Sequence, residues 1–120
     1  MNIIPMNDIS KLSFPDYAVL DINWIDTSHC IISLNGASLE QNNHVKHFDG
    51  CKLYIEFWDD LKISCYNHEL AKWIVQKDDL IDICEITFDS DFIIRGFGMK
   101  TGLWVEYNFK SPKNIYADVP

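Results

Sequence analysis

The segment 91–109 (DFIIRGFGMKTGLWVEYNF) most constrains the fold, because it is typical of two β-strands folded back on each other. In its second half Leu103, Val105, Tyr107 and Phe109 alternate with Trp104, Glu106 and Asn108, and a period of two indicates a strand. Glycines between the halves allow the chain to turn sharply. A lone hairpin is only marginally stable in water, so the rest of the chain must pair with it or pack on it.

The same alternation recurs along the chain and predicts about seven strands in all. Besides the two arms of the hairpin, the expected strands cover 17–25, 30–34, 51–58, 61–66 and 80–88. Short polar turns between consecutive strands favour antiparallel pairing. Seven such strands cannot bury their apolar faces in one flat sheet. We therefore expect a mainly β fold, an antiparallel β-sandwich or half-barrel of about seven strands with at most one short helix.

The expected helix lies near residues 67–77. Asn67 is a suitable N-cap, and Leu70, Trp73, Ile74 and Lys77 recur at helical spacing. A strand from Lys72 to Val75 is the competing interpretation, because this short stretch also contains β-branched and aromatic residues.

The length of 120 residues suits a single domain spanning 1–120. Prolines and turn-forming residues predict an irregular N-terminal segment over 1–15 and an irregular tail over 111–120. The polar stretch 38–44 is expected to be a surface loop. The residues expected in the core are Leu20, Ile22, Leu53, Ile55, Ile63, Ile83, Val105 and Tyr107.

Negative charge is concentrated in one window of the sequence. Ten acidic residues and three lysines lie between Glu56 and Asp91, so this window holds seven of the eight net negative charges. The electric field of such concentrated negative charge disfavours direct binding of nucleic acid and favours a basic protein partner. The alternative is that these acids only keep a small β domain soluble.

The cysteines and the N-terminal residues indicate the cellular compartment in which we expect the protein. The first residues lack the basic and apolar regions of a secretory signal, and no apolar run is long enough to span a membrane. We therefore expect a cytoplasmic protein. Its four cysteines should be reduced and mostly buried, since none forms a CxxC pair.

Chemistry-bearing motifs are sparse. His44 and His47, with Cys51 nearby, are the nearest approach to a metal cluster, but their spacing matches no zinc signature. Asp89 and Asp91 lack the glycine and terminal glutamate of an EF-hand loop. Neither a nucleophile elbow nor a phosphate-binding glycine loop is present. We therefore expect no cofactor, no metal and no enzymatic activity.

Four tryptophans in a small chain are either core residues or interface anchors. Trp58 and Trp104 fall on the more polar faces of their strands, beside Glu56 and Glu106. Tryptophan next to acidic residues is common in protein interfaces, where aromatic residues dominate the binding energy.

The two ends of the chain resemble a known group of proteins. The resemblance is carried by Leu12-Ser13-Phe14-x-Asp16 leading into Val19-Leu20-Asp21-Ile22-Asn23-Trp24, and by Gly96-Phe97-Gly98 followed by Gly102-x-Trp104 and Phe109. These patterns are similar to those of small β-rich bacterial immunity proteins, encoded beside polymorphic or contact-dependent growth-inhibition toxins. The resemblance implies tight binding to one toxin domain, often over its active site, and transfers no catalytic residue.

These observations together predict a cytoplasmic immunity protein that binds a basic toxin domain, possibly a nuclease, through its acidic surface. The alternative is a small ligand-binding β domain or an accessory subunit. The predicted partner-binding residues are Glu56, Trp58, Asp59, Asp60, Asp78, Asp79, Asp82, Glu85, Trp104 and Glu106.

Overall fold

The structure, a computed structural model, describes residues 2–120 and is mainly β, as expected. Within those residues it contains thirteen strands and one short 3-10 helix. The elements are β1 (Asn2–Ile4), η1 (Met6–Lys11), β2 (Leu12–Ser13), β3 (Val19–Asp26), β4 (His29–Leu34), β5 (Ala37–Gln41), β6 (His44–Phe48), β7 (Cys51–Glu56), β8 (Asp60–Asn67), β9 (Lys72–Val75), β10 (Glu85–Phe88), β11 (Phe92–Phe97), β12 (Trp104–Lys110) and β13 (Asn114–Val119).

The strands form three antiparallel sheets. Sheet 1 has the order β1-β13-β7-β4-β3, sheet 2 has the order β10-β11-β12-β8-β9, and the small sheet 3 has the order β2-β5-β6. The predicted closing hairpin is confirmed: β11 pairs with β12, and Phe97 lies opposite Trp104 at its turn.

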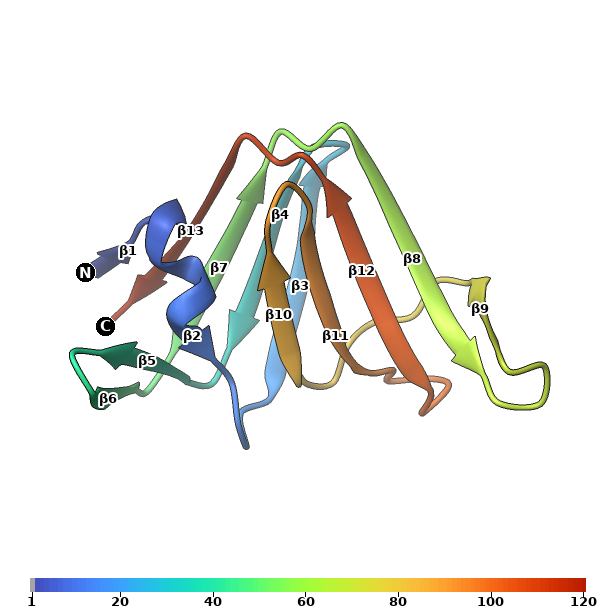
Figure 1. The fold of residues 1–120 in the computed structure, drawn as a ribbon, viewed down its shortest axis with the longest axis horizontal. Helices are drawn as coiled ribbons and strands as arrows, with labels where there is room; N and C mark the ends of the chain where they lie inside the picture. The colour runs from blue at the N-terminus through green and yellow to red at the C-terminus, as the bar shows by residue number, and fades with distance from the viewer. Residues whose placement is uncertain (1) are drawn as a thin grey trace.

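Sheets 1 and 2 are joined at a corner by a bent two-stranded ribbon. β7 continues into β8 and β12 continues into β13, and both halves of the ribbon remain paired. At the bend, Phe57 and Ser111 adopt positive φ angles of 58° and 47°. Figure 1 shows the two sheets diverging from this corner at the top of the view. Strands that switch sheets through such bends are a common way to build the corner of a sandwich.

The core lies between the inner faces of sheets 1 and 2. Along β12 the side chains alternate, so that Val105, Tyr107 and Phe109 are buried and their neighbours are half-exposed. The same period of two buries Leu53 and Ile55 on β7. Close packing of these faces supplies most of the stabilisation expected for a small domain.

The 3-10 helix closes one side of the sandwich. η1 contacts both β13 and β10, and Ile9 at its centre is completely buried. In Figure 1 the helix lies beside β13, near the N-terminus. The segment 1–15 was expected to be irregular, but its described residues 2–15 include β1, η1 and β2, and the apolar residues Leu12 and Phe14 are also buried.

The expected helix at 67–77 is wrong, and the competing strand is present as β9. Asn67 Oδ1 does accept a hydrogen bond from the Leu70 amide at 2.9 Å, but it stabilises a turn. Ala71 then adopts a φ of 51°, which ends any helical path. β9 pairs with β8, and Trp73 lies opposite Tyr66 with their rings 5.5 Å apart.

Three further expectations about elements are corrected. The stretch 38–44 is part of the β5–β6 hairpin, because Asn42 and Asn43 accept the positive φ angles of a tight turn. The tail is not irregular, because residues 114–119 alternate and pair with β7 as β13. The strand expected over 80–88 is shorter, since only 85–88 forms β10.

Most of the predicted core is confirmed. Leu53, Ile55, Ile83, Val105 and Tyr107 are buried, and Ile22 and Ile63 pack against the core while partly exposed. The prediction that Leu20 belongs to the core is wrong. This residue is 66% exposed, because a register shift between Val19 and Asp21 turns it outward.

The cysteines lie mostly inside, as expected. Cys30, Cys51 and Cys65 are buried, and Cys84 is exposed. Burial raises the pKa of Cys30 and of Cys51 to about 12, which keeps both thiols protonated at neutral pH. Among residues 2–120, no helix has the length and apolar character needed to cross a bilayer.

Candidate functional site

An open cleft of about 580 Å³ lies between the two main sheets. It runs along the inner face of β8, where Leu61 and Ile63 are not fully covered by sheet 1. The β3–β4 turn, the corner between β7 and β8, and the segment 77–79 form its rim. We call it the acidic cleft, and its lining residues are Trp24, Asp26, Thr27, Ser28, Trp58, Asp59, Asp60, Leu61, Ile63, Lys77, Asp78, Asp79 and Tyr107.

Two tryptophans form the aromatic wall of the acidic cleft. The Trp24 ring stacks on Tyr107 and Phe109, with ring centroids 6.0 and 6.3 Å away. Trp58 meets Trp24 edge to face at 6.3 Å and packs against Phe109 at 4.9 Å. The buried aromatic residues of β12 therefore fix both indole rings in place.

Asp59 and Asp60 project from the corner between β7 and β8, and both are exposed. Asp60 Oδ1 accepts a hydrogen bond from the Leu61 amide at 2.9 Å, which orients the carboxylate. Lys113 Nζ lies 3.9 Å from Asp59 Oδ1, but both side chains are about two-thirds exposed, so this ion pair contributes little.

Asp26 adds a third carboxylate from the β3–β4 turn. It accepts hydrogen bonds from the Ser28 amide at 2.8 Å and from His29 Nδ1 at 2.7 Å. These two bonds, first that from the Ser28 amide, hold the pKa of Asp26 below its ordinary value. The carboxylate therefore stays charged at neutral pH.

Asp78 is bound within the fold and is not free to reach a partner. Its carboxylate accepts hydrogen bonds from the Lys100 amide at 3.0 Å, the Thr101 amide at 2.9 Å and the Thr101 hydroxyl at 2.6 Å. Its backbone carbonyl accepts one from Tyr107. Gly98 makes this possible, because a Cβ at that position would overlap the carboxylate. Asp78 was predicted to bind the partner, but the hydrogen bonds of its carboxylate within the fold leave it no freedom to reach outward.

Asp79 and Lys77 complete the rim beside Asp78, and both are exposed. Lys77 is the one basic residue among the thirteen described lining residues, against five aspartates. The acidic cleft therefore carries a negative potential, which its low-dielectric walls concentrate.

The structure divides the ten predicted partner-binding residues into two groups. Trp58, Asp59, Asp60, Asp78 and Asp79 meet in the acidic cleft. The other five, which do not line it, are Glu56, Asp82, Glu85, Trp104 and Glu106.

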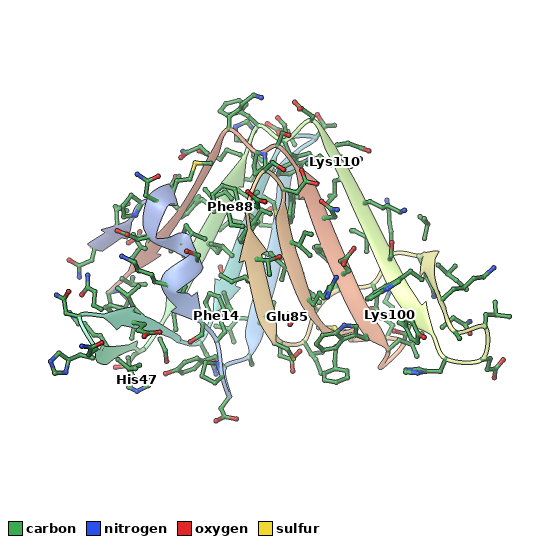
Figure 2. All side chains as sticks on the ribbon, viewed as in Figure 1. Phe14, His47, Glu85, Phe88, Lys100 and Lys110 are labelled. Atoms are coloured by element: carbon green, nitrogen blue, oxygen red, sulfur yellow. The ribbon has the colours of Figure 1, made fainter. Side chains whose placement is uncertain are left out.

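Most of the second group have internal partners. Arg95 lies between Glu85 and Glu106 in the register of sheet 2, and its guanidinium nitrogens approach them at 3.1 and 2.7 Å. In Figure 2, Glu85 lies at the lower end of β10. Asp82 accepts a hydrogen bond from the Phe97 amide at 2.9 Å.

Glu56 and Trp104 complete the second group. Glu56 accepts a hydrogen bond from Asn114 Nδ2 at 2.8 Å, and Trp104 packs against Phe97 with ring centroids 5.2 Å apart. These contacts engage the Glu56 carboxylate and cover part of the Trp104 ring, so less of each is available to a partner outside the cleft.

Sequence reasoning missed Trp24, Asp26 and Tyr107 as members of this site. Tyr107 alternates with polar residues and was therefore predicted only as a core residue, while Trp24 was left open between core residue and interface anchor. Asp26 begins a polar turn, and its position beside Asp59 becomes visible only when β3 and β8 lie opposite each other. The available signal for Trp24 was its residue type, because tryptophan is enriched in protein interfaces.

The candidate metal ligands do not converge. His47 Nδ1 lies 2.8 Å from the Ser38 hydroxyl and 3.3 Å from that of Tyr17, while Cys51 is buried. Asp91 accepts a hydrogen bond from the Ser111 amide at 3.2 Å. Among residues 2–120, no three His, Cys, Asp or Glu side chains lie close enough to hold a metal ion.

No protein-family model, curated protein or solved structure matches this chain. The interpretation of the acidic cleft therefore depends on its geometry and charge.

Proposed function

We propose that the protein is a cytoplasmic immunity protein that neutralises a basic toxin domain, and that the acidic cleft receives part of that domain. The observation that carries this proposal is the joint exposure of Asp26, Asp59, Asp60 and Asp79 around two fixed tryptophans. Rigid aromatic anchors surrounded by charges of one sign are typical of protein interfaces.

The sign of the charge indicates the kind of partner. A toxin that acts on nucleic acid carries positive charge to hold phosphates, and an acidic inhibitor competes for that same surface. Complementary charge also speeds association, which suits a protein that must neutralise a toxin promptly.

The test is binding to the C-terminal domain of the toxin encoded next to this gene. We expect a stable complex, and we expect the triple variant D59K/D60K/D79K to bind more weakly and to associate more slowly. The matched control is E40K/E69K/D89K, which changes the net charge equally at exposed positions outside the cleft.

Two results would contradict the proposal. The first is failure of the purified pair to bind. The second is an equal effect of the two triple variants, because then only net charge matters and the acidic cleft has no special role.

A second candidate function is binding of a small organic cation. The acidic cleft has a volume of about 580 Å³, within the range of about 300–1,000 Å³ that is typical of small-molecule sites. Tryptophan faces and carboxylates together also suit an ammonium group. Native mass spectrometry of the purified protein separates the two candidates, because a retained small cation supports the second.

A further inference from the structure

The exposed part of Trp24 is not explained by packing alone. One face of its ring stacks on Tyr107 and Phe109, yet the residue remains 39% exposed where it lines the acidic cleft. β3 is the edge strand of sheet 1, so no further strand of the sheet covers this side. The indole therefore presents aromatic surface to whatever enters the cleft.

Carboxylates lie around this aromatic surface on more than one element. Asp26 comes from the β3–β4 turn, Asp59 and Asp60 from the corner before β8, and Asp79 from the segment before β10. The aromatic wall and the carboxylates of this concave site attract the same kind of group, namely a cation that can also contact a π face.

We infer that the acidic cleft is a guanidinium-binding site, occupied by an arginine side chain of the protein partner. The identity of the occupant rests on the proposed function, whereas the chemistry of the site does not.

The geometry favours arginine over lysine. A guanidinium is planar, so it stacks on an indole while its edge donates several hydrogen bonds to carboxylates. Trp24 and Trp58 stand at 87° to each other, so a flat group stacked on one ring presents its edge toward the other side of the cleft. An ammonium is a compact, strongly hydrated charge that does not use such a flat arrangement.

The experiment uses the full chain labelled with ¹⁵N and two small probes, N-acetyl-arginine amide and N-acetyl-citrulline amide. Citrulline has nearly the same shape but lacks the charge. We expect the arginine probe to shift the indole N–H signals of Trp24 and Trp58 saturably. We expect the citrulline probe to bind at least about tenfold more weakly, because charge-assisted hydrogen bonds are lost.

Matched variants locate the site. Trp24→Leu should weaken binding of the arginine probe about two- to fivefold, as expected for loss of a cation–π contact, with Trp58 as the reporter. Trp73→Leu is the control, because Trp73 is also 39% exposed but lies outside the cleft. D59N/D60N should weaken binding about tenfold, whereas E69Q/D89N should leave it unchanged.

The wild-type comparison of the two probes requires no variant, so misfolding of Trp24→Leu cannot hide the answer. The inference is overturned if the indole N–H chemical shifts of Trp24 and Trp58 do not change up to the solubility limit of the arginine probe. It is also overturned if both probes bind with equal affinity. If the chain binds the arginine probe but not the toxin domain, the guanidinium site is supported and the proposed function is contradicted. If the chain binds the toxin domain but not the probe, the proposed function is supported and the guanidinium site is contradicted.

Discussion

Asp78 and Asp79 are adjacent in the sequence but have different roles in the structure. Asp78 is 4% exposed and accepts three hydrogen bonds from the turn at 100–101, whereas Asp79 is exposed on the cleft rim. The first fixes the connection from β9 to β10 against the turn between β11 and β12. The second remains available to a partner.

We therefore expect Asp78→Ala to lower the free energy of unfolding by roughly 2–4 kcal/mol, because it removes a buried carboxylate that accepts three hydrogen bonds. Asp79→Ala should change it by less than about 0.5 kcal/mol, as is usual for exposed positions. Urea unfolding measures both, and equal losses would contradict the distinction.

The same carboxylate adds a pH dependence to stability. Burial alone would raise the pKa of Asp78, but hydrogen bonds from Thr101 and the Lys100 amide outweigh it and hold the pKa below its ordinary value of 3.8. A lowered folded-state pKa stabilises the fold above pH 3.8, and this stabilisation is lost as pH falls below it. Unfolding midpoints of Asp78→Ala should therefore fall less steeply below this pH than those of the wild type.

Residue roles of this kind are only partly visible in the sequence. Alternation on strands identified Leu53, Val105 and Tyr107 as core, because a period of two follows directly from strand geometry. It could not separate Asp78 from Asp79, since that difference arises from a turn 22 and 23 residues away. Of the five predicted cleft members, the aspartates came from charge clustering and Trp58 from its place on a polar strand face. Trp24 and Asp26 required the packing of two sheets.

At the scale of elements, strand pairing decided the cases that local patterns left open. Residues 67–77 fit a helix by spacing, but pairing of β9 with β8 and the Tyr66–Trp73 contact stabilise a strand. β13 was missed because the prolines at 112 and 120 resemble the borders of a loop. Its partner β7 is more than fifty residues away, so no local signal reports the pairing.

The corner of the bent ribbon provides an element-scale prediction. Ser111 holds a φ of 47°, which costs energy for a residue with a Cβ. Ser111→Gly should therefore raise the free energy of unfolding by about 0.5–1 kcal/mol, and the backbone hydrogen bond to Asp91 is retained.

Ser90→Gly is the matched control, because Ser90 lies in another turn and is not among the described residues with positive φ. Here glycine should be neutral or slightly destabilising, since it only increases the freedom of the unfolded chain. An equal change in both variants would show that strain at the corner is not the cause.

At the scale of the whole molecule, the sandwich is closed on one side and open on the other. η1 covers the side between β13 and β10, while the side between β3 and β8 contains the acidic cleft. Four of the five aspartates that line this opening are exposed, and the chain as a whole carries a net charge of −8. If the proposed function is right, this negative charge attracts the basic toxin domain before contact is made.

We expect the rate of association with the toxin domain to fall at least about tenfold between low and physiological salt. The reason is screening, since the Debye length shrinks from about 30 Å at 0.01 M to about 8 Å at 0.15 M. The dissociation rate should change much less. Stopped-flow tryptophan fluorescence measures both rates, and a salt-independent association rate would contradict long-range attraction.

The position of β13 also has a consequence for folding during synthesis on the ribosome. This strand lies between β1 and β7, so residues 114–119 pair with residues 2–4, which are synthesised long before them. Sheet 1 cannot be completed until residues 114–119 have left the exit tunnel. Contacts between such distant parts of a chain form slowly, so we expect the pairing of β1 with β13 late in folding. If the proposed function is right, protection against a toxin begins only after β13 has joined sheet 1.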